Sequence, residues 1–119
     1  RVVLVRDSVV GMALVLDLLA ASEQSVSALV ADLPKYELIK TKAKCAKDKI
    51  KRVLANVEST FANQELSTID GVRIDWPEGW VHVRGSNTEP IMRIIGEGPD
   101  RQTAQDLVQR IQKIVDTTD

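Results

Sequence analysis

Residues 72–84 read VRIDWPEGWVHVR, and this stretch decides the fold. Apolar residues at positions 72, 74 and 76 alternate with polar ones, as expected of a strand with one buried face. The turn-forming Pro77-Glu78-Gly79 returns the chain into a second alternating run that ends at Arg84. The pattern predicts an antiparallel β-hairpin in which Trp76 and Trp80 pack as a cross-strand pair.

The segments on either side of the hairpin add strands and helices. Alternation predicts one strand at Ile39–Cys45 and another at Ile91–Gly96, and residues 66–69 fit a further short strand. Two segments have an apolar stripe at helical spacing, one of about 15 residues after Cys45 and one after the breaker Gly98-Pro99-Asp100. The stripes are Ile50, Val53, Leu54, Val57 and Phe61, and Ala104, Leu107, Val108, Ile111, Ile114 and Val115. We expect an α+β fold, a mostly antiparallel four-stranded sheet with two helices on one face.

The first 34 residues follow a different pattern. Val2–Val5 predicts a short strand, and Ser8 is expected to cap a helix at Val9–Ala21 that is apolar nearly all round. A second helix is expected to start at Ser25 and to stop at Pro34. A helix without a polar face needs cover on several sides, which this segment cannot supply. We therefore expect residues 1–34 and 35–119 to be separate domains, with the first the less stable part.

Composition excludes several classes of function. The 119 residues carry 16 basic and 17 acidic side chains, so no overall charge favours nucleic acid or an anionic membrane. The longest apolar run, residues 9–21, is shorter than a membrane span needs. Cys45 is the single cysteine, which excludes an internal disulfide and suits the cytoplasm. The basic segment Lys35–Arg52 could contact phosphates, but its lysines on an alternating strand favour a solvated face.

Residues 84–93, RGSNTEPIMR, concentrate groups that bind phosphate. Arg84 and Arg93 can each hold an oxyanion through two hydrogen bonds. Hydroxyl and amide donors follow at Ser86, Asn87 and Thr88, and Gly85 is expected to free the backbone for an anion-binding nest. The same residues are also ordinary turn formers, so composition alone leaves both interpretations open. His82, two residues before the segment, is either a modulator of the charge or a hydrogen-bonded surface residue.

This segment resembles the C-terminal signature of the phosphohexomutase superfamily: Arg, a variable residue, Ser-Asn-Thr-Glu-Pro, two residues and Arg. Only the variable position, Gly85, differs from the Pro or Ala that relatives often carry. The similarity extends to Arg6-Asp7 and the following helix, to residues 25–36, and to Thr68–Val72. The chain looks most similar to the phosphomannomutase and phosphoglucosamine mutase type. It starts at Arg1 without a methionine, and we expect it to be a piece of a longer protein.

The resemblance implies a division of labour. Residues 1–34 would be the end of the third mutase domain, and residues 35–119 the fourth, TATA-binding-protein-like domain. Arg84, Gly85, Ser86, Asn87, Thr88 and Arg93 would bind the phosphate of a phosphorylated hexose.

The family's phosphoserine, its Asp-rich Mg²⁺ loop and its sugar-selecting loop have no counterpart in this sequence. The chain alone is therefore expected to be inactive and to hold no cofactor. Mg²⁺ and a hexose 1,6-bisphosphate intermediate would belong to the longer enzyme and its upstream domains. The alternative is a stand-alone, non-catalytic module that binds phosphate or a partner.

Overall fold

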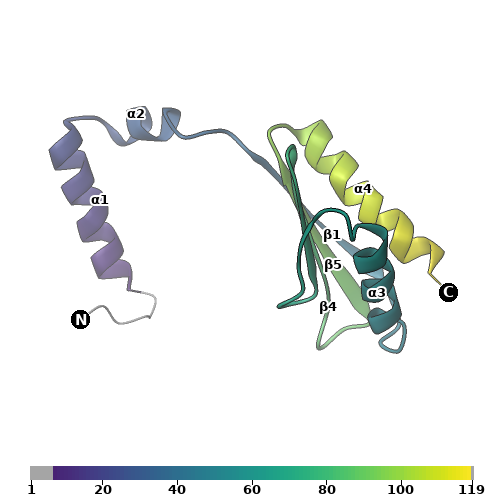
Figure 1. Cartoon of the computed structure of the whole chain (residues 1–119). Coiled ribbons are helices and arrows are strands. Elements are labelled where there is room, and N and C mark those ends of the chain that lie inside the picture. Colours follow the sequence, from purple (N-terminus) through teal and green to yellow (C-terminus); the bar gives the residue numbers. More distant parts are fainter. Residues whose placement is uncertain (1–6, 119) are drawn as a thin grey trace. The chain divides into compact units, whose positions relative to one another are not determined.

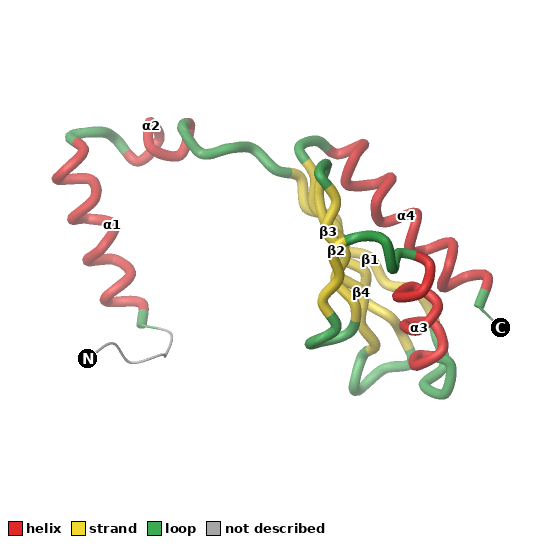
Figure 2. The backbone as a smooth tube through the Cα atoms, in the orientation of Figure 1, coloured by secondary structure: helices red, strands yellow, loops and turns green. Residues whose placement is uncertain are grey.

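A computed structural model describes residues 7–118, which fall into two compact units that divide between Pro34 and Lys35. The second unit is an α+β domain whose antiparallel sheet has the strand order β1-β5-β4-β3-β2 (Figures 1 and 2). Its elements are β1 (Glu37–Lys44), α3 (Ile50–Thr60), β2 (Glu65–Ser67), β3 (Val72–Trp76), β4 (Gly79–Gly85), β5 (Ile91–Gly98) and α4 (Arg101–Thr117). The predicted class and the hairpin at residues 72–84 are confirmed.

The sheet has five strands, so the predicted count of four is wrong. The further short strand predicted at residues 66–69 is present as β2, which is three residues long and pairs with β3 at one edge. Only Leu66 of this strand packs against the core. A strand this short has too few positions to show an alternating pattern, which is why its sequence supports it only weakly.

Helices α3 and α4 cover one face of the sheet, as Figure 1 shows. Each strand sends every second side chain to this face, and each helix sends the apolar stripe that its sequence predicts. Asp100 caps α4 by accepting a hydrogen bond from the Thr103 amide at 2.8 Å. The most deeply buried side chains are Ile74, Met92, Ile94, Leu107, Ile111, Val53, Val57, Val81 and Val83. The other face of the sheet, called here the open face, carries the alternate, mainly polar side chains.

The two tryptophans do not form the predicted pair. Trp76 lies opposite Gly79, and Trp80 lies opposite Asp75, so the rings point to different faces of the sheet. Trp76 meets the edge of Phe61 at a ring separation of 5.3 Å on the helix side. On the open face the Arg73 guanidinium lies 4.3 Å from the Trp80 ring centre. The hairpin turn is one residue tighter than a direct pairing of the tryptophans requires.

The first unit consists of α1 (Ser8–Ser22) and α2 (Val26–Ala31). The helices occur where the sequence predicts them, but the cap of α1 is Asp7 and not Ser8. The Asp7 carboxylate accepts from the amides of Val9 and Val10, both at 3.0 Å, and a hydroxyl one residue later could not reach them in this way. Ser25 is the cap of α2, so this helix begins one residue after its predicted start. The predicted strand at residues 2–5 lies outside the described residues.

No side chain of α1 is buried, although most of the helix is apolar. Leu14 and Leu16, for example, are each 65% exposed. Exposure of such a surface to water is unfavourable, because apolar area stabilises a fold only when it is removed from water. This unit therefore shows the uncovered apolar surface that its sequence implies.

Stability of the second unit is expected to fall at low pH. The hydrogen bond from Arg73 lowers the pKa of Asp75 from its usual 3.8, and the Thr103 amide lowers that of Asp100. The unfolded chain therefore binds protons at these carboxyls more readily than the folded one. Their contribution is fully present above about pH 4 and is lost as the pH falls through the lowered pKa values.

Urea unfolding followed by tryptophan fluorescence reports this unit, because both tryptophans of the chain lie in it. Asp75→Asn should lower the unfolding free energy at pH 7 and change it less near pH 3. An equal loss at both pH values would show that the charge of Asp75 does not stabilise the fold.

Candidate functional site

The six predicted site residues surround one cavity of about 150 Å³ at the end of β4 and the start of β5. Arg84 and Arg93 lie directly opposite each other in the β4–β5 ladder, and both point to the open face. The loop between the strands supplies the remaining polar lining. The cavity lining is Arg84, Gly85, Ser86, Asn87, Thr88 and Arg93. Sequence positions nine residues apart thus meet because the strands that carry them pair.

Backbone and hydroxyl hydrogen bonds hold the loop in a compact form. The Ser86 amide donates to the Ile91 carbonyl at 2.9 Å, which closes the loop at its base. The Ser86 hydroxyl accepts from the Glu89 amide at 3.3 Å and lies 3.5 Å from the Thr88 hydroxyl. Pro90 then fixes the backbone before β5 begins. These hydrogen bonds within the loop shape the cavity.

Gly85 is required for close packing and not for the backbone freedom that its sequence context suggests. It belongs to β4, pairs with Met92, and has none of the positive φ angles found at Gly71 and Gly79. A Cβ at this position would lie 2.7 Å from Cγ2 of Ile50, the first residue of α3. The expectation of an unusual conformation at Gly85 is therefore wrong, because extended backbone carries the chain through this point.

Arg84 is held by a residue from a distant turn. Its Nη1 donates to Oδ2 of Asp70 at 2.9 Å, and the Asp70 carbonyl accepts a hydrogen bond from Nε2 of His82. A carbonyl can only accept, so Nε2 of His82 carries the proton. The interpretation of His82 as a hydrogen-bonded residue is confirmed. Asp70 therefore links the side chains of His82 and Arg84 on the open face, the first through its backbone carbonyl and the second through its carboxylate.

Arg93 has a weaker partner and an unused donor. Its Nη2 lies 3.8 Å from Oε2 of Glu89, which is too long for a hydrogen bond. Its Nε is buried and has no hydrogen-bond partner within the described part of the chain. A buried donor without a partner is unfavourable by about 1–3 kcal/mol.

Three residues near the site escaped the sequence analysis. Asp70 and Glu89 are the acidic partners of the two arginines, and Lys47 reaches the loop, where its Nζ donates to the Asn87 carbonyl at 3.5 Å. Glu89 stands inside the signature, so its spacing of four from Arg93 was a usable signal. Nothing in the sequence connects positions 47 and 70 to the loop.

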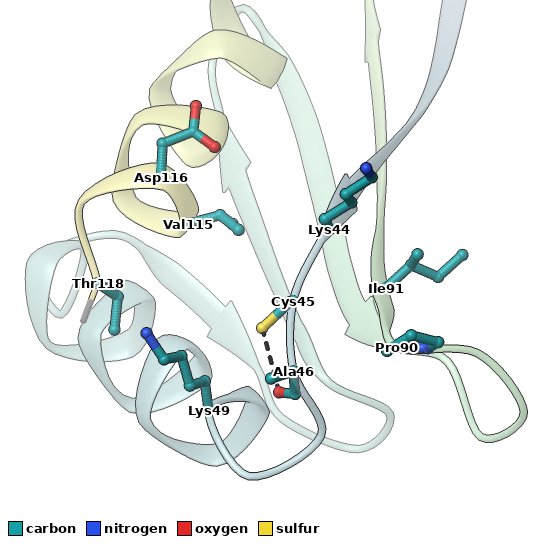
Figure 3. A pocket seen from close by; sticks show the side chains of 9 residues that line it. All are labelled: Lys44, Cys45, Ala46, Lys49, Pro90, Ile91, Val115, Asp116 and Thr118. Atoms are coloured by element: carbon teal, nitrogen blue, oxygen red, sulfur yellow. Dashed lines mark hydrogen bonds between the residues drawn. The ribbon is translucent and has the colours of Figure 1, made fainter.

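A second cavity, of about 680 Å³, lies beyond the exit of the loop (Figure 3). It brings together the end of β1, the residues before α3 and the end of α4. Cys45 lines it, and burial raises the pKa of this thiol. The lining is more apolar than that of the loop cavity and gathers no comparable set of anion donors. It is Lys44, Cys45, Ala46, Lys49, Pro90, Ile91, Val115, Asp116 and Thr118.

Residues 7–118 contain neither a metal-binding cluster nor a membrane-spanning helix. Over that range no group of three or more His, Cys, Asp or Glu side chains is placed to hold a metal ion. The helices described are also too short or too polar to cross a bilayer. The loop cavity thus remains the place where polar donors converge.

The chain is similar to sugar-phosphate mutases. It is 40% identical over 116 residues to the phosphoglucosamine/phosphogalactosamine mutase of Sulfurisphaera tokodaii, a match that covers 94% of this chain and 25% of the relative. It is 35% identical over 109 residues to a phosphoglucomutase/phosphomannomutase of Thermococcus kodakarensis, with 90% and 24% covered. The chain therefore spans about a quarter of the length of these curated relatives.

A solved structure and a family model agree with these relatives. The structure of a phosphoglucomutase/phosphomannomutase family protein from Burkholderia thailandensis superposes with a TM-score of 0.56 at 27% identity, covering 76% of this chain and 20% of that one. The model of the phosphoglucomutase/phosphomannomutase C-terminal domain matches residues 38–114, which include the whole sheet core and the loop cavity. On this evidence the chain belongs to the phosphoglucomutase/phosphomannomutase C-terminal domain family.

Proposed function

We propose that this chain is the C-terminal region of a phosphohexomutase and binds the phosphate of the hexose substrate. The observation that carries the proposal is the loop cavity, whose lining consists of two arginines, two hydroxyls, an amide and a glycine. The two arginines support it, because each guanidinium group can donate two hydrogen bonds to a phosphate. Residues 1–34 would be the end of the preceding domain.

The reaction proposed for the longer enzyme is the interconversion of hexose 1- and 6-phosphates, of the phosphomannomutase or phosphoglucosamine mutase type. Phosphoryl transfer depends mainly on positioning and charge stabilisation, and this region would hold the phosphate that is not being transferred. A contact to phosphate, rather than to sugar hydroxyls, serves both orientations of the sugar. Mg²⁺ would be held by upstream domains of the same polypeptide. The longer enzyme would be cytoplasmic.

The uncovered helix α1 fits this proposal. In the longer protein, upstream parts of the same polypeptide would bury its apolar side chains, which is the favourable state for such a surface. A second candidate function, a stand-alone phosphate-binding module, would leave this surface in water. The helix therefore favours the mutase.

The test is an activity comparison. The chain alone should show no interconversion of the 1- and 6-phosphates of mannose or of glucosamine, whereas the polypeptide encoded by the complete reading frame should show it for at least one of the two sugars. A reading frame that encodes no phosphoserine loop and no Asp-rich loop upstream would overturn the mutase proposal in favour of the module.

Asp70→Asn is expected to strengthen phosphate binding. The carboxylate lies 2.9 Å from Arg84 Nη1, and its negative charge opposes an incoming phosphate. The amide keeps a hydrogen bond to Arg84 and removes the charge. Because both side chains are substantially exposed, we expect only a two- to fivefold rise in affinity, about the energy of one exposed ion pair.

The measurement is a titration of the chain with inorganic phosphate, followed by the amide shifts of the loop. Asp106→Asn, on the exposed surface of α4, removes the same charge away from the cavity and serves as the control. If Asp70→Asn weakened binding instead, the carboxylate would act by orienting Arg84.

A further inference from the structure

The sheet register places a third cation beside the two arginines of the loop cavity. Lys42 of β1 lies directly opposite Arg93 of β5, and Arg93 lies directly opposite Arg84 of β4. The row Lys42–Arg93–Arg84 therefore crosses three adjacent strands. Opposite side chains in such a ladder have Cβ atoms about 4.5–5.5 Å apart.

Burial shows that all three side chains point to the open face. The rows on either side of this one lie under the helices. One is Ala43, Met92 and Gly85 and the other is Thr41, Ile94 and Val83, and all of these are buried except Gly85 and Thr41, which are partly buried. Since successive residues of a strand point to opposite faces, the intervening row faces away from the helices. Lys42 is exposed there.

Three like charges in one row are unfavourable without an anion. Like charges directly opposite each other destabilise a sheet. The carboxylate of Asp70 lies 2.9 Å from Arg84 Nη1 and offsets the repulsion there. The carboxylate of Glu89 lies 3.8 Å from Arg93 Nη2 and offsets it only weakly. The ion pairs formed within residues 7–118 leave Lys42 without an acidic partner. The row thus has an uncompensated charge at its β1 end.

We propose that Lys42 is a further phosphate-binding residue, whose ammonium group contacts the phosphate from the β1 side while Arg84 and Arg93 contact it from β4 and β5. The inference rests on the proposed function and extends that same site beyond the signature loop. A flexible ammonium suits this position, because it acts as a mobile point charge while the two guanidinium groups fix the geometry. The ligand would be the dianionic phosphate of a sugar phosphate.

Two opposite effects of Lys42→Met distinguish this role from a structural one. The methionine keeps much of the length and apolar stem of the lysine but removes its charge. Affinity for inorganic phosphate should fall about two- to fivefold, as expected for one exposed charge contact. Resistance to urea without phosphate should rise, because repulsion within the row is relieved. A residue that only supports the fold would lower both quantities.

The matched control is Lys40→Met. Lys40 lies on the same strand and the same face, but opposite Ile95 instead of an arginine. Lys40→Met should leave the phosphate affinity nearly unchanged, and Lys42→Arg should retain most of the binding. Both lysine variants remove one unit of charge, so the comparison separates a local contact from the general field of the domain.

The experiment is a phosphate titration of the whole 119-residue chain and its variants, followed by the amide shifts of residues 85–89 and repeated at higher ionic strength. Equal losses for Lys40→Met and Lys42→Met, or no loss for Lys42→Met while Arg93→Ala binds poorly, would overturn the inference and leave the proposed function standing. If Arg93→Ala also bound phosphate normally, the proposed function itself would fail.

Discussion

Arg93→Ala is expected to weaken phosphate binding by about 1.5–3 kcal/mol, the usual contribution of a hydrogen bond to a charged group. The loss should be larger than for the other lining residues for two reasons. Arg93 lies between the two other cations of its row, and its acidic partner Glu89 is 3.8 Å from its Nη2. A phosphate therefore gains a contact with a guanidinium group whose charge no close carboxylate offsets.

The fold should tolerate this substitution. Arg93 lies on the open face, and its ion pair with Glu89 is long and exposed, so its loss changes stability by about 1 kcal/mol or less. Arg101→Ala, at the exposed first position of α4, removes the same charge beyond the opposite end of β5 from the loop and should leave the affinity unchanged. In the complete enzyme, Arg93→Ala should reduce substrate binding and turnover together. Unchanged kinetics for both Arg93→Ala and Arg84→Ala would exclude the assigned site.

Gly71→Ala is expected to destabilise the second unit by about 2–4 kcal/mol, among the larger effects of a single substitution. Gly71 has a φ of 73°, which is unfavourable for any residue with a Cβ. The added Cβ would also lie 2.2 Å from the Val83 carbonyl oxygen and 2.7 Å from Cβ of Arg84. Both neighbours belong to β4, so the backbone itself would have to move.

The same change should also damage the site. Relief of the contact with Arg84 would separate the turn that carries Asp70 from the strand that carries Arg84, and so shift the guanidinium. Gly85→Ala is the control, because φ is ordinary there and the contact is with the side chain of Ile50, which can adjust at a cost of about 1 kcal/mol. Urea unfolding followed by tryptophan fluorescence measures both variants. Equal stability of the two would contradict the role given to the positive φ.

The hairpin and the two covering helices could be predicted because their patterns are long and regular. Residues 72–84 alternate over two strands, and the apolar stripe of α4 continues over several turns. The spacing of the apolar residues therefore predicts which side chains are buried. Strand β2 is too short to carry such a pattern. The tryptophan pair was wrong because one residue of register decides which face a side chain occupies, and local sequence does not determine that register at a turn.

In the candidate site, too, the contiguous residues could be predicted from the sequence and the residues from other segments could not. The loop residues could be named in advance because the signature is contiguous, and the strand pairing then brings Arg84 and Arg93 together. Asp70 could not be named, since it comes from a distant turn and meets Arg84 only through the fold, and the register that sets Lys42 opposite Arg93 is equally absent from the local sequence. Contacts of this kind depend on long-range pairing, which periodicity does not reveal.

The most direct test of the phosphate-binding role is an amide-resolved NMR titration of the whole chain with glucose 6-phosphate, inorganic phosphate and unphosphorylated glucose. The proposed site predicts that both phosphates shift the amides of residues 84–89 and 93, weakly but saturably, and that glucose shifts none of them. Weak affinity is expected because the open face leaves the cavity in contact with water. Shifts that fail to saturate, that centre on the cavity around Cys45, or that occur equally with glucose would contradict phosphate binding at this loop.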